Sequence, residues 1–161
     1  MSIEIKRINE NEIESVTEIY LESFHGMRDK IIASDYHLKL LKAFPVVQYY
    51  GAFRGNKLLG YIRWIERGGY RENAVFELEQ IAVRKIFREK GIGGLLIRES
   101  LSEIKNYLKR RGSRLKTVIV LCGKDNLIAR HLYKKNLNAR VIAEIPNLFR
   151  GDEILLKADF R

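Results

Sequence analysis

The spacing of apolar residues predicts a short strand and two helices in the first part of the chain. Residues 3–7 have the pattern of a strand. Asn9 or Asn11 can cap the helix that follows, in which apolar residues recur at helical spacing: Ile13, Val16, Ile19, Tyr20 and Phe24. A second helix is predicted over residues 28–43. It ends before Pro45, and its apolar positions available for burial are Ile31, Ile32, Leu38 and Leu41.

The rest of the chain alternates between strand-like and helix-like patterns. Residues 46–53 and 58–66 form a predicted hairpin, and residues 73–83 form a third strand. The helix over residues 93–111 ends at Gly112, and its buried stripe is Ile97, Leu101, Ile104 and Leu108. Residues 117–122 are almost purely apolar, as in a central strand covered on both faces. A helix over 126–137, with Asn136 in a left-handed conformation at its end, precedes strands over 139–145 and 153–160.

The predicted order is therefore β-α-α-β-β-β-α-β-α-β-β. It indicates a mixed α/β fold with a mostly antiparallel central sheet and helices on both faces. A chain of 161 residues is long enough for one domain with a substantial core, so a single domain over residues 1–161 is expected.

Composition narrows the class of protein. With 46% apolar and 31% charged residues the chain is typical of a soluble globular protein. No apolar run approaches the ~20 residues that span a bilayer, and the first residues lack the pattern of a signal peptide, so no membrane association is expected. The single cysteine, Cys122, cannot form an internal disulfide, which favours a cytoplasmic location. His25, His37 and His131 lack metal-ligand spacing, so no metal site is expected.

The net charge of +10 is concentrated in one stretch. Residues 84–116 contain eleven Lys or Arg and three Glu, which gives +8. These cations can complement the end of a helix dipole, attract a phosphorylated cofactor near residues 84–90, or bind nucleic acid. Nucleic acid is the weakest of the three interpretations, because the stretch lacks interleaved aromatic residues and any known nucleic-acid-binding motif.

The most informative stretch is a glycine turn, defined here as residues 88–94, between a predicted strand and a predicted helix. Its sequence is Arg-Glu-Lys-Gly-Ile-Gly-Gly. Backbone N–H groups and the helix dipole make such a turn a binding place for an anion. It is not a P-loop, because Gly94 and Leu95 follow Gly93 in place of Lys and Ser or Thr. It is not a dinucleotide fingerprint, because Leu96 takes the place of the last glycine. The alternative interpretation is that these residues only connect the strand to the helix and bind nothing.

Two motifs resemble those of the GNAT superfamily of N-acetyltransferases. The first is Arg-x-x-Gly-x-Gly at residues 88–93, after a strand that ends Gln80-Ile81-Ala82-Val83. The second is Asn126-x-x-Ala129-x-x-x-Tyr133. The resemblance covers about residues 75–145, and the family's usual Gly-Phe after the tyrosine is Asn136-Leu137 here. It implies the acyl-CoA N-acyltransferase (GNAT) fold, with acetyl-CoA as cosubstrate.

The resemblance also implies how acetyl-CoA binds. In the family the strand before the turn and the strand after the next helix splay apart at a bulge. The pantetheine arm then pairs with exposed backbone of Ile81, Ala82 and Val83, and an N–H near Ile81 can stabilise an oxyanion. The pyrophosphate lies on the glycine turn, at Arg88, Glu89, Lys90, Gly91, Ile92, Gly93 and Gly94.

The second motif implies the remaining contacts of the pantetheine arm. Asn126, Ala129 and Tyr133 share one face of a helix and would contact it. Without the resemblance, Asn126 would be interpreted as a helix N-cap and Tyr133 as a core aromatic residue.

Acetylation of an amine needs a base and an acid. An alkyl amine has a pKa near ~10.4, so a carboxylate must remove its proton, and Glu79 is the first candidate with Glu77 second. Both glutamates could instead be solvated carboxylates. Tyr133 would protonate the leaving thiolate. An acyl intermediate on Cys122 is disfavoured, because no histidine lies near it in sequence.

The expected function is acetyl-CoA-dependent N-acetylation of a primary amine, on a small molecule or a peptide, by direct attack in a ternary complex. A non-catalytic acyl-CoA sensor and a basic nucleic-acid-binding protein are the alternatives, and a homodimer is left open.

Overall fold

The computed structural model of this protein describes residues 2–161. Its chain forms two compact units. The first unit consists of Met1–Trp64 and Gln80–Ser100, and the second consists of Ile65–Glu79 and Leu101–Arg161. The prediction of a single domain over residues 1–161 stays a prediction.

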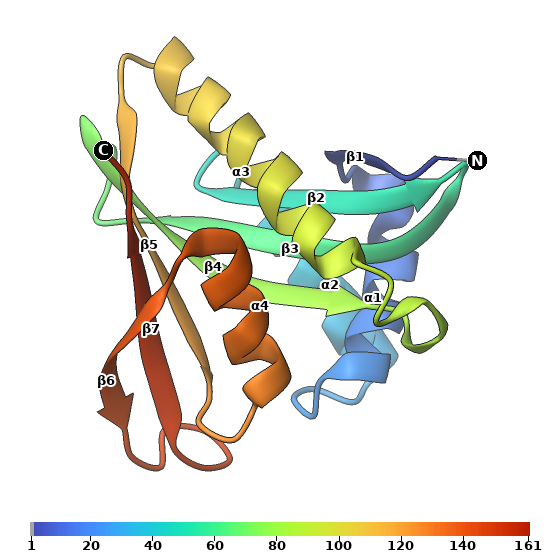
Figure 1. Cartoon of the computed structure of the whole chain (residues 1–161). Coiled ribbons are helices and arrows are strands. Elements are labelled where there is room, and N and C mark those ends of the chain that lie inside the picture. Colours follow the sequence, from blue (N-terminus) through green and yellow to red (C-terminus); the bar gives the residue numbers. More distant parts are fainter. Residues whose placement is uncertain (1) are drawn as a thin grey trace. The chain divides into compact units, whose positions relative to one another are not determined.

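The order of helices and strands agrees with the order predicted from the sequence (Figure 1). In the described residues the elements are β1 Glu4–Arg7, η1 Glu10–Glu12, α1 Ile13–Ser23, α2 Lys30–Leu41, β2 Val47–Arg54, β3 Lys57–Arg67, β4 Asn73–Val83, η2 Lys85–Phe87, α3 Ile92–Arg110, β5 Arg114–Gly123, α4 Leu127–Leu137, β6 Arg140–Ile145 and β7 Glu153–Asp159. The strands follow the order β1-β2-β3-β4-β5-β7-β6. β1–β2, β5–β7 and β6–β7 pair antiparallel, whereas β4–β5 pair parallel. The predicted mixed α/β class with a mostly antiparallel sheet is confirmed.

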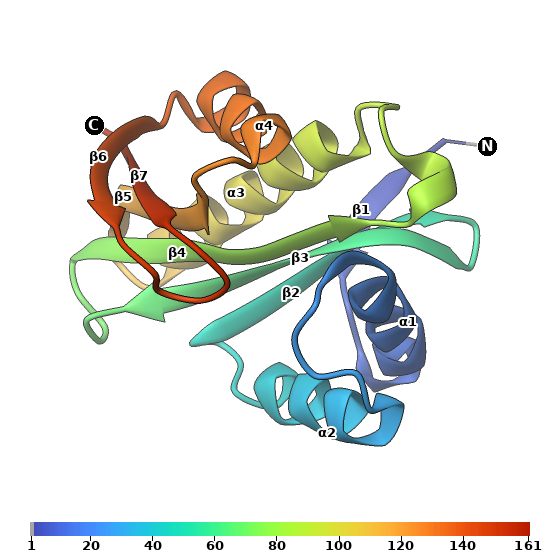
Figure 2. The ribbon, with the colours of Figure 1, turned by 90° about the horizontal axis from the view of Figure 1, so that it is seen from below.

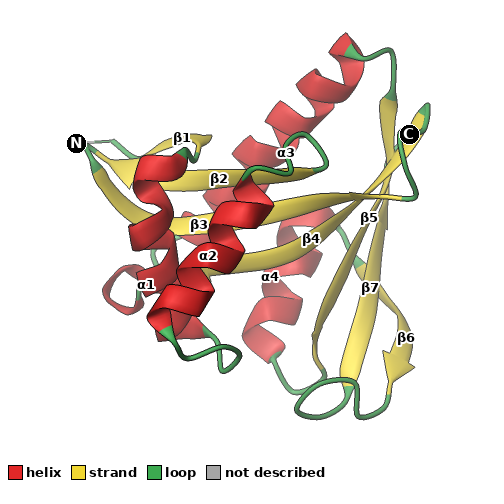
Figure 3. Ribbon diagram, turned by 180° about the vertical axis from the view of Figure 1, so that it is seen from behind, coloured by secondary structure: helices red, strands yellow, loops and turns green. Residues whose placement is uncertain are grey.

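In the first unit, helices cover both faces of the strands. Figure 3 shows α1 and α2 in front of β2 and β3, and Figure 1 shows α3 on the other side. Ile13, Val16, Ile19 and Tyr20 of α1 are buried, as their spacing predicted. On the α3 side, Trp64 Nε1 donates a hydrogen bond to Ser100 Oγ at 2.8 Å, so these two buried polar groups are paired.

The buried face of α2 differs from the prediction. Ile31 and Ile32 are 81% and 53% exposed, and Ala33 and His37 are the buried residues. Apolar residues lie all around this helix, so its sequence does not define a buried side. The polar network of His37 fixes that side instead. The prediction that Ile31 and Ile32 are buried was wrong.

His37 is part of a fully buried polar network in the first unit. Arg63 donates to the Tyr49 hydroxyl at 2.8 Å, and that hydroxyl lies 2.9 Å from His37 Nδ1. Because the Tyr49 oxygen already accepts from Arg63, its proton is available to His37 Nδ1. Burial and the nearby Arg63 charge lower the pKa of His37 from 6.5 to about 4.

The protein should lose stability between about pH 6.5 and pH 4. In that range the unfolded chain protonates His37 and the folded chain does not, so acidification favours unfolding. A pKa difference of this size corresponds to roughly 3 kcal/mol. Urea denaturation from pH 7 to pH 4.5 would measure it. The slope with pH should flatten in His37→Gln and persist in His131→Gln, where the imidazole is exposed. Equal slopes in wild type and His37→Gln would contradict the assignment.

In the second unit, α4 lies on one face of β5 and β7 (Figure 2). Strand residues that point to one face are fully buried: Val118, Val120, Cys122, Ile154, Leu156 and Ala158. Residues that alternate with them, such as Leu121 and Leu155, are only half-buried. The prediction of a strand covered on both faces is therefore corrected, since only one face of β5 is fully buried within this unit.

The ends of the helices agree with the predicted signals except at α1 and α4. Asn9 caps the short η1, whereas the N-cap of α1 is Glu12 and makes no side-chain capping hydrogen bond. Gly112 follows α3 with a φ of 79°, in the left-handed region where glycine has no Cβ penalty. After α4 the left-handed residue is Asn138, with a φ of 55°, and not Asn136 as predicted. Asn136 lies within the helix, and its side chain donates to the Leu132 carbonyl at 2.8 Å.

Candidate functional site

The glycine turn of the first unit has the backbone geometry of an anion site. Glu89 and Gly91 have φ values of 61° and 79°, and the Gly91 carbonyl accepts the N–H of Leu95 at 3.1 Å. α3 therefore begins directly after Gly91. The N–H groups of Ile92, Gly93 and Gly94 have no acceptor within the helix, and no acidic residue lies in its first turn. These N–H groups and the positive end of the helix dipole favour a bound anion.

The cationic side chains of the turn are used to hold it in place. Arg88 Nε donates to the Val83 carbonyl at 2.9 Å, and its guanidinium also donates to Ser23 Oγ at 3.0 Å. Lys90 Nζ donates to the Ile86 carbonyl at 3.3 Å. The structure thus joins the predicted turn to the end of β4 in one unit, and gives Arg88 a positioning contact that the sequence did not indicate.

Ile81, Ala82 and Val83 form the last part of β4. Ala82 is buried, whereas Ile81 and Val83 are half-buried. The chain leaves the strand at Arg84, whose N–H donates to the Leu59 carbonyl at 2.8 Å. Arg84 also forms ion pairs with Glu18 at 3.0 Å and Glu22 at 3.3 Å, so this cation stabilises the fold.

In the second unit, the ladder between β4 and β5 stops before either strand ends. Its register runs from Asn73↔Arg114 to Glu77↔Ile119, with an irregularity between Ala74 and Val75. β5 continues to Gly123 paired with β7, while β4 continues beyond Glu77. In the described chain no β4–β5 pair follows Glu77↔Ile119. This interruption has the form that the family resemblance implied, and it leaves backbone groups that need other partners.

The two candidate bases on β4 differ in environment. Glu77 is 8% exposed, and its Oε2 lies 2.6–2.7 Å from two guanidinium nitrogens of Arg67. Glu79 is half-buried and lies just past the last β4–β5 pair. Glu79 stays the first candidate because it lies just past the last β4–β5 pair, whereas Glu77 lies within the ladder.

The residues of the second motif lie on α4 as predicted. Asn126 is the N-cap, and its Oδ1 accepts the N–H of Ala129 at 3.1 Å. Asn126 is exposed, Ala129 half-buried and Tyr133 5% exposed. The side-chain oxygen Oδ1 of Asn126 is therefore used for the cap, and the side-chain nitrogen Nδ2 takes no part in the cap.

Tyr133 and Cys122 are neighbours whose protonation is linked. Burial, with a smaller effect of Cys122, raises the pKa of Tyr133 above its ordinary value. Burial and the nearby Glu153 carboxylate raise the pKa of the Cys122 thiol to about 11. Both groups are protonated at neutral pH. The phenol can act as a proton donor, whereas the thiol is a poor nucleophile, which further disfavours an acyl-cysteine intermediate.

Glu153 is a residue that the sequence prediction missed. It begins β7, it pairs with Gly123 at the end of β5, and burial raises the pKa of its carboxyl. The only sequence signal is its alternation with Leu155 and Lys157, which places these side chains on one face of the strand.

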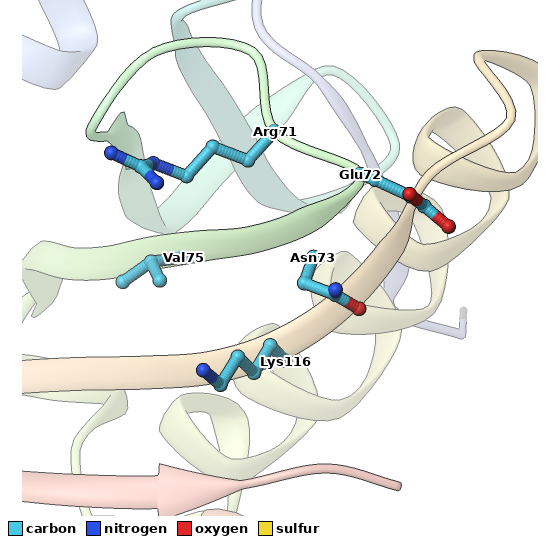
Figure 4. Close-up of a pocket in the computed structure, with 5 residues that line it drawn as sticks. All are labelled: Arg71, Glu72, Asn73, Val75 and Lys116. Atoms are coloured by element: carbon cyan, nitrogen blue, oxygen red, sulfur yellow. The ribbon is translucent and has the colours of Figure 1, made fainter.

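An open cavity of about 500 Å³ lies at the other end of the β4–β5 ladder (Figure 4). It is lined by Arg71, Glu72, Asn73, Val75 and Lys116. None of the predicted site residues lines this cavity. It lies near Asn73 in the first pair of the ladder, whereas Glu77 is in the last pair. Within residues 2–161, His, Cys, Asp and Glu side chains form no group of three that could hold a metal ion, and no helix is long and apolar enough to span a bilayer.

Comparisons with known proteins agree on one family. The family model "Acetyltransferase (GNAT) family" matches residues 13–138. Among solved structures, the PaiA N-acetyltransferase from Thermoplasma acidophilum in complex with coenzyme A aligns with a TM-score of 0.73, 18% identity, and coverage of 99% of this chain and 100% of that chain.

Two further acetyltransferases give similar alignments. The ribosomal-protein-S18-alanine N-acetyltransferase from Escherichia coli gives a TM-score of 0.74, 16% identity and coverage of 98% and 94%. A spermidine N-acetyltransferase SpeG chimera from Vibrio cholerae and hSSAT gives a TM-score of 0.76, 15% identity, and coverage of 99% of this chain and 96% of that chain. Identities this low show the shared fold alone. No curated protein sequence matches the chain.

Proposed function

The chain belongs to the acetyltransferase (GNAT) family, whose model matches most of its length, and we propose that it transfers the acetyl group of acetyl-CoA to a primary amine by direct attack in a ternary complex. Family membership supports acetyl transfer in general, and acetyl-CoA is the family's typical cosubstrate. The observation that carries the proposal is the backbone geometry of the glycine turn, which leaves the N–H groups at the start of α3 without acceptors in the helix.

The residues present fit acetyl-CoA. The N–H groups of Ile92, Gly93 and Gly94 would hold the pyrophosphate, and the backbone of Ile81–Val83 would pair with the amides of the pantetheine arm. Asn126 Nδ2 would donate a hydrogen bond to the same arm, and the small side chain of Ala129 would lie beside it. Arg88 and Lys90 would contribute mainly by fixing the turn, given their contacts to Val83 and Ile86.

Glu79 and Tyr133 would move the protons of the reaction. Bound acetyl-CoA would supply a thioester carbonyl, where the C–N bond forms as the C–S bond breaks. The Glu79 carboxylate would take the proton from the attacking nitrogen, directly or through water. The Tyr133 hydroxyl would give its proton to the departing sulfur and regain one from solvent. An N–H near Ile81 would donate to the carbonyl oxygen as negative charge develops there.

A panel of amines assayed with acetyl-CoA tests this proposal. Thiol release should depend on the amine, and the acetylated product should be detectable. Acetyl-CoA binding without product for any amine would instead favour an acyl-CoA sensor. RNA or DNA binding that falls steeply with salt and that coenzyme A does not displace would favour a nucleic-acid-binding protein.

Acetyl-CoA should raise the thermal stability of the wild-type protein, and Gly93→Val should abolish that effect. A ligand at 100 times its Kd stabilises the folded state by ~2.7 kcal/mol. A valine side chain in the first turn of α3 would block the approach of the pyrophosphate to the backbone. Differential scanning fluorimetry with and without acetyl-CoA measures the shift.

Ser102→Val is the matched control, because it puts the same β-branched residue on an exposed position of α3. It should lower stability slightly and keep the shift. A normal shift in Gly93→Val would mean that the turn is only a connection.

A further inference from the structure

One face of β5 and β7 combines apolar and charged side chains that are only half-buried. Directly opposite residues in an antiparallel pair point to the same side, and the pairs here are Gly123↔Glu153, Leu121↔Leu155 and Ile119↔Lys157. These side chains lie on the face away from α4, and Figure 3 shows the strands from that side. The face therefore has an apolar middle with an acidic and a basic end.

Glu153 forms the acidic end. Gly123 opposite it has no side chain, and a Cβ there would lie 3.9 Å from Glu153 Oε1. The carboxylate thus lies along bare backbone. No ion pair of Glu153 occurs in residues 2–161, and burial raises the pKa of its carboxyl. A half-buried, unpaired carboxylate is suited to bind a cation.

The same face leads to the end of the β4–β5 ladder. Glu77 is the partner of Ile119, so Glu77 points to this side. The apolar strip, defined as Ile119, Leu121 and Leu155, thus lies between the carboxylates of Glu153 and Glu77, and Arg67 holds Glu77 in an ion pair.

We propose that this face binds the acceptor substrate, with the Glu153 carboxylate on its ammonium group and the apolar strip against an aryl or alkyl body. The proposal rests on the proposed function, because it names the substrate class of that same reaction. The acceptor is then a primary monoamine with a substantial apolar group.

The apolar strip argues against polyamines. A second substrate cation reaching along the strip from Glu153 would lie against Ile119, Leu121 and Leu155. These side chains do not compensate for the lost hydration of a charge. The face therefore discriminates between one cation with an apolar body and several cations on a chain.

Calorimetric titration with 2-phenylethylamine tests the site without any need for turnover. We expect wild type to bind it more tightly than 1,4-diaminobutane. Glu153→Gln keeps the side-chain shape and removes the charge, so affinity should fall roughly 10- to 100-fold, as for loss of a charged hydrogen bond. Leu121→Ser should weaken the binding of 2-phenylethylamine and leave the affinity for 1,4-diaminobutane nearly unchanged.

Glu144→Gln is the matched control. Glu144 lies on the neighbouring strand β6, opposite Ile154 of β7, and its exposed ion pair with Lys124 contributes little. The affinity of the Glu144→Gln variant for 2-phenylethylamine should equal that of wild type.

Three results would overturn the proposal: no binding of 2-phenylethylamine by wild type, preference for 1,4-diaminobutane, or unchanged affinity in Glu153→Gln. Binding that depends on Glu153 but is not followed by thiol release with acetyl-CoA would count against the proposed function and not against this site.

Discussion

Glu79→Gln should lower kcat by 10²- to 10⁴-fold, the range usual for loss of a general base. Glutamine keeps the side-chain shape but cannot accept the proton of the attacking nitrogen. Affinity for acetyl-CoA should stay nearly unchanged, because the proposed pyrophosphate site is the glycine turn and contains no part of Glu79. Steady-state kinetics together with acetyl-CoA titration would separate these two effects.

The pH dependence of this deficit reports the role of Glu79 directly. As the pH approaches the ~10.4 of an alkyl amine, more substrate is neutral without help, so the deficit should shrink. Glu77→Gln is the comparison variant. It leaves Arg67 unpaired and should lower stability more than kcat. A rate for Glu79→Gln within about threefold of wild type would move the base to Glu77, to water or to no protein group.

Tyr133→Phe should bind acetyl-CoA normally and turn over 10²- to 10⁴-fold more slowly, the range for loss of a general acid. The substitution removes one hydroxyl and keeps the buried ring, which is 5% exposed. Burial raises the pKa of the phenol, so it is protonated at neutral pH and has a proton to give. Transfer to the departing sulfur moves the negative charge to the phenol oxygen, which then takes a proton from solvent.

Acyl donors with different leaving groups test the proton transfer itself. A thiol of lower pKa needs less protonation, so the deficit of Tyr133→Phe should shrink with such a donor. Tyr70→Phe, in which the lost hydroxyl belongs to a 64% exposed side chain, should behave as wild type. An undiminished kcat in Tyr133→Phe would remove Tyr133 from the catalytic residues. Weaker acetyl-CoA affinity with a normal maximal rate would make it a binding residue.

Local sequence signals were sufficient for the order of elements, the position of the glycine turn and the placement of the second motif on α4. Apolar periodicity, glycines and capping residues act over a few positions, so they can be interpreted without knowing the fold. The range Asn73–Val83 for β4 and the buried stripe of α3 agree with the structure for this reason. Asn126 is a local case too, since the contact that caps the helix lies three residues away.

Only the tertiary structure decided which side chains become partners across long sequence separations. The buried side of α2 is the side of His37, which lies in one polar network with Tyr49 of β2 and Arg63 of β3. The apolar Ile31 and Ile32 do not define it. Arg67 forms an ion pair with Glu77 because β3 and β4 bring the two residues together. Cys122 lies near Tyr133 because α4 packs on β5 (Figure 2), and Glu153 lies opposite Gly123 because β5 pairs with β7. Burial and charge at these positions come from strand register and packing, which a single sequence does not encode in any short window.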